Sequence, residues 1–347
     1  MRKQALILIS VFVCATSIHA QDYNDPVSYM NAINDSHKVM DQTYMAYISA
    51  AAHSRRAKKI DRMREQTIQS ISDTKYKLVD LPLYKGDNML RKGFIDYTDF
   101  LYKVFNDDYA HIVNLEEIAE QSVDEMEALI LLQEKTDEKI KLANARADSI
   151  YEAFAAKYNV TLIKGEQNAL QQKLATAGKL NHYVNEVYMA FFKCNWQDGQ
   201  ITNAINNKNL ANIEQSRNAL IAYADEGLKA LDTLKSFEGD ASLMTACKRA
   251  LTFYKSMAEN DMPKLLDFYL KQENFEKIKK AFDAKSQSSR TQQDVDAYNK
   301  AVNELNNSIK TYNALNEKIN SERSAVIDNY NQVENSFKDT HTPYYKK

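Results

Sequence analysis

The clearest grouping of residues that could bind a metal is a histidine with carboxylates nearby. Asp107 and Asp108 precede His111 by one helical turn, and three more acids follow at Glu116, Glu117 and Glu120. Di-metal helical bundles instead need a Glu-x-x-His pair on each of two helices, with further glutamates facing inward. At an offset of 153 residues the chain has Lys264 in place of His111, so a symmetric ligand set is missing. We therefore expect a solvated helix end, with no metal and no cofactor.

Motifs for catalysis do not occur in this chain. There is no Gly-x-Ser-x-Gly, His-Glu-x-x-His, Walker loop or Gly-x-Gly-x-x-Gly pattern. The formal net charge is -2, from 45 basic and 47 acidic side chains, which gives no field that would attract nucleic acid. We therefore expect a protein that is not an enzyme and has no nucleic-acid partner.

A dense basic cluster is the one candidate for an anion or lipid-headgroup contact. Its members are Arg55, Arg56, Lys58, Lys59, Arg62 and Arg64. Apolar residues interleave with these cations, as they do in helices that lie on membrane surfaces. A solvated charged face is the alternative, and we favour it.

Two cysteines are candidates for a disulfide. Cys194 and Cys247 both lie on apolar helical stripes, and an even cysteine count in an oxidising compartment favours a bridge. The first and third helices of an up-down bundle are diagonal neighbours, however, and their axes are usually too far apart for one. Two buried free thiols are the alternative, and the sequence leaves both open.

The N-terminus has the features of a secretory signal peptide. Arg2 and Lys3 precede a short apolar run, and Ala20 stands before a polar segment. We expect residues 1–20 to be removed, which leaves an exported chain with a net charge of about -4 and no transmembrane segment. Cys14 raises the alternative of a lipoprotein, but Val13 stands where a small residue is required, so we do not expect lipid anchoring.

The scarcity of turn residues predicts an all-α fold. Only 7 Gly and 4 Pro occur in 347 residues, too few for sandwiches, barrels or doubly wound sheets. Apolar residues recur at three- and four-residue spacing in both halves, with one uninterrupted stretch from about Asn114 to Ala156 and another from Val295 to Phe337. The near-3.5 period is typical of coiled-coil packing, so we expect long helices and an elongated molecule.

An internal repeat relates the two halves of the chain at an offset of 153 residues. The best-kept element is an aromatic-x-Gly-Asp-x-x-Leu sequence, which supplies Tyr84, Gly86 and Asp87 in one half and Phe237, Gly239 and Asp240 in the other. The aspartates could be acids or metal ligands. The favoured interpretation is a structural turn, in which Gly adopts a positive φ, Asp caps the next helix and the aromatic ring packs beneath.

This arrangement resembles an uncharacterised family of exported, all-helical bacterial surface proteins, over about Tyr29 to Leu266. The resemblance implies a helical fold and export, and it brings no activity. We expect two tandem antiparallel bundles related by duplication, over residues 21–160 and 161–347. The predicted function is a non-catalytic interaction or scaffolding protein of the periplasm or cell surface, with a protein or cell-envelope component as partner. A binding or chaperone-like protein that uses the groove between bundles is the runner-up, and a helical metal protein or enzyme is third.

Overall fold

The described part of the chain is almost entirely helices joined by short connections, and this confirms the all-α fold class. The computed structural model describes residues 23–53, 57–116, 118–162 and 169–345, and over these ranges it contains no strand, only isolated bridges in two turns. The first five helices are α1 (Pro26–His53), α2 (Ala57–Asp80), α3 (Met89–Lys103), α4 (Tyr109–Glu116) and α5 (Val123–Lys157). The next five are α6 (Ala169–Asn206), α7 (Leu210–Thr233), α8 (Ser242–Ser256), α9 (Met262–Asp283) and α10 (Gln292–His341).

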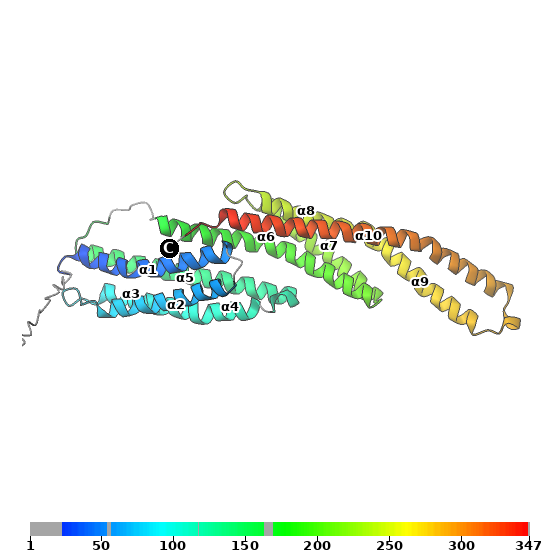
Figure 1. Ribbon diagram of the computed structural model, residues 1–347, viewed down its shortest axis with the longest axis horizontal. Coiled ribbons are helices and arrows are strands. Elements are labelled where there is room, and N and C mark those ends of the chain that lie inside the picture. The colour runs from blue at the N-terminus through cyan, green and yellow to red at the C-terminus, as the bar shows by residue number, and fades with distance from the viewer. Residues whose placement is uncertain (1–22, 54–56, 117, 163–168, 346–347) are drawn as a thin grey trace, which may run out of the picture.

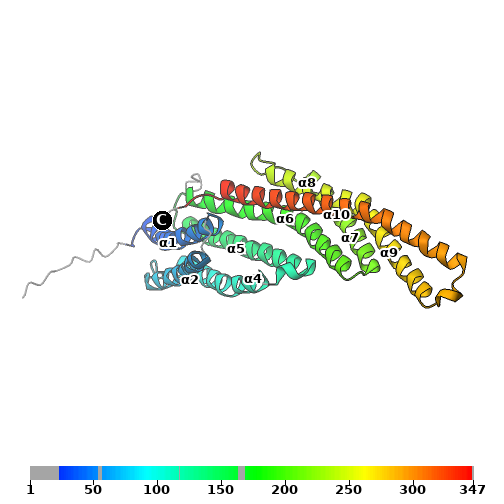
Figure 2. The same cartoon turned by 45° about the vertical axis from the view of Figure 1, so that its right-hand side comes forward.

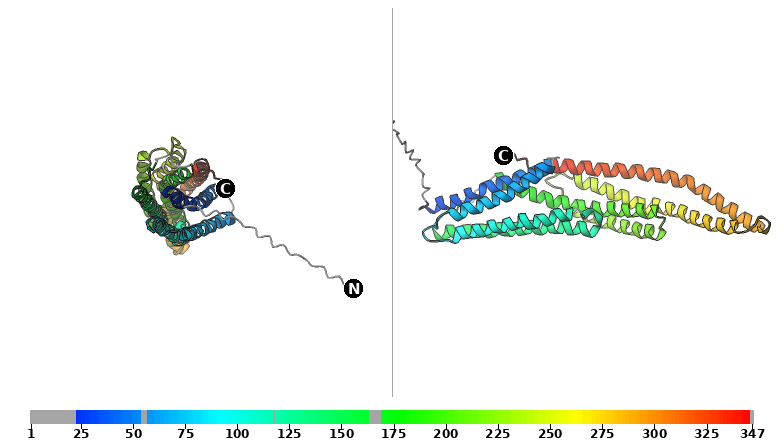
Figure 3. Two further views of the ribbon diagram at one scale, coloured as in Figure 1. Left: turned by 90° about the vertical axis from the view of Figure 1, so that its left-hand side faces the viewer. Right: turned by 60° about the horizontal axis from the view of Figure 1, so that its bottom comes forward.

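The molecule is elongated, and its helices run nearly along the long axis (Figures 1 and 2). We call α1–α5 the first bundle and α6–α10 the second bundle. The longest helix is α10, whose 50 residues correspond to roughly 75 Å at 1.5 Å per residue. Its first half and α9 extend past the turn that joins α6 to α7 and form a two-helix arm (Figures 1 and 3).

Side-chain caps explain where several helices begin. The backbone N–H of Ser28 donates to Oδ2 of Asp25 at 2.7 Å, one residue before α1. Ser122 accepts from the N–H of Glu125 at the start of α5. Thr291 and Asp294 form a reciprocal capping box at the start of α10. Each cap satisfies a backbone donor that has no partner within its helix.

The expected uninterrupted stretch from about Asn114 to Ala156 is wrong at its start. Helix α4 ends at Glu116, a short 3-10 turn covers Ala119–Gln121, and α5 begins at Val123. The break follows from Ser122, whose extended backbone and side-chain acceptor make it an N-cap. From Val123 onward the stretch is one helix, as the spacing predicts.

The middle segments of the two bundles have matching bounds. Helices α7 and α8 begin and end 153 residues after α2 and α3. Both α3 and α8 continue into a π-helical turn, at Val104–Asp108 and at Met257–Asp261. The order of helix, Gly-Asp turn and helix is therefore the same in both. A common origin of the two halves stays a prediction.

Helix α6 of the second bundle joins the two bundles, because it packs against α1 and α5 as well as against α7, α8 and α10. At the junction Phe192 of α6 lies in one apolar cluster with Val123 and Met126 of α5. The indole N–H of Trp196 donates to the carbonyl of Gln121 at 3.1 Å. The expected boundary between residues 160 and 161 falls in the connection from α5 to α6, at the opposite end of α5 from this filled junction.

Candidate functional site

Asp87 ties the start of α3 to the end of α5. Its Oδ1 accepts a hydrogen bond from the backbone N–H of Met89 at 2.8 Å. Its Oδ2 accepts from Lys157 Nζ at 2.7 Å and from the Tyr158 hydroxyl at 2.8 Å. These donors, with Lys157 first, hold the pKa of the Asp87 carboxyl below its ordinary value.

Asp240 makes the equivalent connection in the second bundle. Its Oδ1 accepts from the backbone N–H of Ser242 at 2.8 Å, and its Oδ2 lies 2.8 Å from Nε2 of His341, at the end of α10. The hydrogen bond from His341 is the main cause of the lowered pKa of Asp240. In both bundles the turn aspartate thus joins the third element to the last helix.

The rest of the motif also has a structural role. Gly86 and Gly239 have φ of +82° and +90°, the left-handed region that glycine enters without strain. Tyr84 and Phe237 are buried beneath the turns, at 2% and 8% exposure. One detail differs from the sequence prediction: the aspartates do not occupy the N-cap position itself. They lie one residue earlier and still accept the first free N–H of the helix.

The candidate disulfide is not present. Cys194 and Cys247 are both free thiols with no exposed surface, on α6 and α8. Burial raises the pKa of the Cys194 thiol to about 12, and that of Cys247 also rises well above its ordinary value. The Cys247 thiol donates to the carbonyl of Val187 at 3.5 Å. Each residue therefore acts as a small apolar side chain of the core.

The basic cluster is only partly covered by the described residues, since Arg55 and Arg56 lie outside them. Lys58, Lys59 and Arg62 are exposed on the first turns of α2, and Arg64 is half-buried. Exposure on the outside of a helix is what a solvated charged face requires. Contact with an anion or a lipid headgroup stays a prediction.

The acid and histidine group near residue 111 does not converge on one point. Asp108 forms an ion pair with Lys139 of α5 at 2.8 Å, and His111 is exposed on α4. Glu117 lies outside the described residues. Across the ranges that the structure describes, no three histidine, cysteine, aspartate or glutamate side chains are placed to hold a metal ion.

A buried ion pair between α6 and α10 was missed by the sequence analysis. The Arg323 guanidinium donates to both carboxylate oxygens of Asp198, with Nε to Oδ2 at 2.6 Å and one terminal nitrogen to Oδ1 at 2.9 Å. Only 5% of the Asp198 side chain is exposed, and burial raises its pKa while Arg323 opposes that rise. Arg323 interrupts an otherwise apolar stripe, and that interruption was the available signal. The partner lies 125 residues away, so the pairing itself could not be foreseen.

Two carboxyls of the first bundle that the sequence analysis missed have raised pKa values. Asp41 of α1 is half-buried and Asp137 of α5 has an exposed side chain, and desolvation by the surrounding protein raises the pKa of each carboxyl to about 6. The hydroxyls of Tyr44 and Tyr109 are 3.4 Å apart, and the charge of Asp137 acts on both. Desolvation makes the charged form of each carboxyl less stable, so the stability of the first bundle depends on pH.

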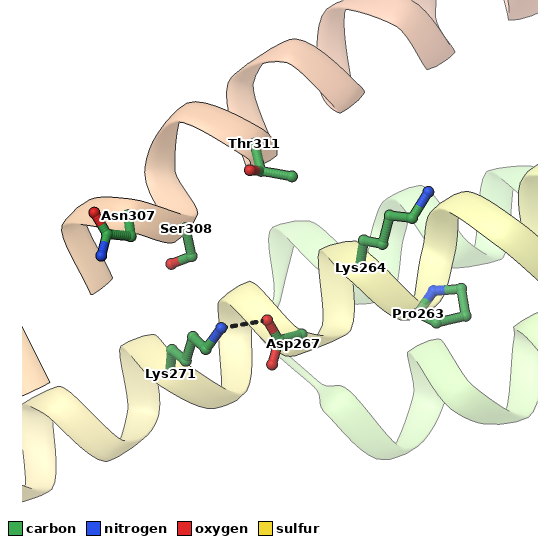
Figure 4. A pocket seen from close by; sticks show the side chains of 7 residues that line it. All are labelled: Pro263, Lys264, Asp267, Lys271, Asn307, Ser308 and Thr311. Atoms are coloured by element: carbon green, nitrogen blue, oxygen red, sulfur yellow. Dashed lines mark hydrogen bonds and ion pairs between the residues drawn. The ribbon is translucent and has the colours of Figure 1, made fainter. Parts of the chain in front are cut away.

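Two shallow depressions on the described surface lie along the arm. One is lined by residues of α9 and α10, among them Lys264, Asp267 and Thr311 (Figure 4). Figure 4 shows Asp267 paired with Lys271 along α9 instead of pointing toward α10. The lining of this depression holds a single carboxylate, Asp267, which is already paired with Lys271, and the neighbouring depression around Ala314 is lined by lysines with no carboxylate or histidine.

None of the described helices combines the length and apolar content that crossing a bilayer requires. Comparison with protein families, with curated proteins and with solved structures finds no match.

Proposed function

We propose that the protein is an exported, non-catalytic interaction or scaffolding protein of the cell envelope, and that the arm is its main contact element. The observation that carries this proposal is the shape of the molecule, in which α9 and the first half of α10 extend beyond the other helices (Figure 1). An extended, narrow element places contact residues far from the body of the protein, and such contacts do not need a binding cavity.

The arm is well suited to making contacts because it has almost no buried interior of its own. Between residues 266 and 318 only Ala301 and Ser308 are buried. Aromatic pairs join the two helices instead, with Phe268 stacked on Tyr312 at 4.2 Å and Phe282 on Tyr298 at 4.7 Å between ring centroids. Rings that stay partly accessible supply large contact areas at protein interfaces.

The junction between the bundles supports this reading over a binding or chaperone-like groove. The apolar cluster at that junction is filled by Phe192 together with residues of α5, and Trp196 closes it with a hydrogen bond to Gln121. A groove that accepts a ligand or an unfolded chain needs open apolar surface at that place. A helical metal protein or enzyme remains the third proposal.

Capture from a cell-envelope extract, using the chain from residue 21 onward, tests the role of the arm. Leu270 on α9 is 55% exposed, and Leu142 on α5 is 56% exposed, so the two leucines form a matched pair. We expect Leu270→Lys to weaken capture of the partner at least tenfold and Leu142→Lys to leave it unchanged. Cross-links from the captured partner should fall on arm lysines such as Lys277. Equal losses in both variants, or cross-links confined to the first bundle, would contradict the assignment.

A further inference from the structure

Two histidines, one from each bundle, hold the end of α10 and the residues after it. His53 is the last residue of α1. Its Nδ1 lies 2.6 Å from Oδ1 of Asp339, and its Nε2 lies 3.2 Å from the carbonyl oxygen of Thr342. His341 is the last residue of α10, and its Nε2 lies 2.8 Å from Oδ2 of Asp240. Only 13% of each histidine side chain is exposed. We call these five residues the two-histidine contact.

The segment that follows α10, residues 342–345, lies beside α1 of the first bundle (Figure 1). The backbone N–H of Tyr345 donates to Oγ of Ser49 on α1 at 3.1 Å. Lys173 on α6 donates to the carbonyl oxygen of Tyr344 at 2.8 Å. The Tyr344 ring lies 5.1 Å from the His53 ring between centroids. The second bundle therefore contacts the first bundle through this segment, and His53 lies at its start.

Both ring nitrogens of His53 face oxygen atoms that accept hydrogen bonds and donate none. A neutral imidazole carries one N–H group, whereas the imidazolium carries two. Only the protonated ring can therefore donate to the Asp339 carboxylate and to the Thr342 carbonyl at the same time. A neutral ring directs a lone pair at one of these two oxygens, which removes one hydrogen bond and adds a repulsion.

The surroundings of His341 also favour the protonated ring. Its bond to Asp240 is charge-assisted on both sides only while the imidazole is cationic, and such bonds are about twice as strong as neutral ones. The lowered pKa of Asp240, whose main cause is this bond, reflects the same attraction. In addition, His341 and His53 both stand at the C-terminal end of a helix, where the helix dipole stabilises a cation.

The first bundle makes the corresponding contact with a group that stays charged at neutral pH. Lys157 donates to Asp87 at 2.7 Å at the end of α5, and this bond raises the pKa of Lys157 above its ordinary 10.5. Histidine, in contrast, is the side chain whose charge ordinarily changes between about pH 5 and 8. The fold therefore does not require a histidine at the end of the last helix, and the two bundles differ in how this contact responds to pH.

The other titratable groups around the two-histidine contact are carboxylates, phenols and lysines. From α10 and its connection to Tyr345, from α6 and from the turn before α8 they are Glu334, Lys338, Asp339, Tyr344, Tyr345, Lys173, Tyr183 and Asp240. Arg55 and Arg56 lie outside the described residues. Carboxylates, phenols and ammonium groups ordinarily titrate well below or well above the interval in which histidine does. Among the described residues at this place, the two histidines are therefore the groups whose type titrates near neutral pH.

We propose that the two-histidine contact is a pH-sensitive connection between the bundles, which holds the end of α10 while His53 and His341 are protonated and releases it as they lose their protons. Protonation supplies the second donor of His53 and the positive charge of His341. The contact is therefore complete at about pH 5 and is lost as the pH rises toward about 8. This proposal does not depend on the role given to the arm.

Hydrogen exchange measured by mass spectrometry tests the proposal on the chain from residue 21 onward. Peptides that cover residues 338–345 are compared with peptides that cover residues 152–158 at the end of α5, after correction for the intrinsic pH dependence of amide exchange. We expect the end of α10 to exchange about tenfold faster at about pH 8 than at about pH 5.5, while the end of α5 does not change. Equal protection of the end of α10 at both pH values would overturn the proposal.

Exchange of the donor types supplies matched variants. Glutamine donates through its amide at every pH, so the double variant His53→Gln with His341→Gln should lose the pH dependence. Lys157→His places a titratable donor at the end of α5 and should introduce a dependence of about tenfold there. Each single glutamine variant should keep only part of the dependence at the end of α10. If the full dependence persists in the double variant or in both single variants, other groups cause it and the proposal is wrong.

Discussion

His341 lies 2.8 Å from Oδ2 of Asp240 through its Nε2, although 101 residues separate the two in the sequence. Lys157 makes the corresponding contact with Asp87, at 2.7 Å. The last helix of each bundle is thus fastened to the turn that precedes its third element. The two donors differ in type and do not align at the offset of 153 residues. The two bundles therefore share the contact between turn and last helix, although different residues make it.

Removal of either turn aspartate should therefore destabilise the fold. Asp87→Ala and Asp240→Ala each lose a helix cap together with a charge-assisted hydrogen bond, and we expect a cost of about 1–2 kcal/mol. Asp87→Asn and Asp240→Asn keep an acceptor for the backbone N–H and should cost less. Urea denaturation of the four variants measures this order. If partner capture fails while stability is unchanged, the turn has a binding role.

The buried pair of Asp198 and Arg323 should behave as a unit. Arg323→Met leaves a carboxylate with 5% of its side chain exposed and no cation, which should cost about 3 kcal/mol or more. The double variant Asp198→Leu with Arg323→Met should cost less than the single change, because no unpaired charge remains. A double-mutant cycle from urea unfolding gives the coupling. Additive costs would mean that the pair contributes little.

The sequence predicts the helices of this protein better than it predicts the contacts between them. Spacing of apolar residues is a local signal, and the stretch from Val295 to Phe337 that it predicts lies within α10. The possible disulfide remained undecided because it depends on whether α6 and α8 face each other with suitable geometry, which no local pattern encodes. Nothing near His341 in the chain indicates that Asp240 is its partner, because 101 residues separate the two.

The arm illustrates a different limit. The apolar stripe of residues 295–337 has the same spacing in both halves, so the sequence does not indicate that its first half has only α9 as a neighbour while its second half packs on α6 and α8. Burial shows the difference: Tyr330 is fully buried, whereas Tyr298 and Tyr312 remain partly accessible. The number of helices around a stripe is a tertiary property, and a heptad pattern alone does not determine it.

Close packing at Gly227 should make this position intolerant of a side chain. A Cβ atom there would lie 2.5 Å from Cδ2 of Leu251 and 3.3 Å from the Cβ of Ala190, where α6, α7 and α8 meet. We expect Gly227→Ala to destabilise the protein by about 1–3 kcal/mol. Gly199 lies within α6 with open space around it, and Gly199→Ala should be neutral or stabilise by up to about 1 kcal/mol through helix propensity. Thermal unfolding compares the two, and equal effects would contradict the close approach.

The free thiols predict a simple chemical result. Cys194 and Cys247 should both react with an alkylating reagent once the unreduced protein is unfolded, and neither should react in the native state, because both are fully buried. Intact-mass measurement before and after unfolding counts the modified thiols. A mass lower by two hydrogens, with no alkylation until reductant is added, would show that a bridge forms after all.

The two desolvated aspartates give the protein a defined response to pH. Burial raises the pKa of Asp41 and of Asp137 to about 6 from the ordinary 3.8, so the folded state binds more protons than the unfolded state between these values. Stability contributed by these groups is therefore present below about pH 4 and is lost as the pH rises through about 6. Asp41→Asn removes the cost of the desolvated charge and should stabilise the protein by roughly 1–2 kcal/mol at pH 7–8 and by almost nothing at pH 4. Asp137→Asn should act in the same direction but less, because its side chain is exposed and solvent screens the charge. Asp283→Asn, at an exposed position, is the control and should show no such dependence.

Fluorescence of Trp196, the single tryptophan, reports urea unfolding at each pH. A gain in stability at pH 4 equal to that at pH 8 would show that these carboxyls are not the titrating groups.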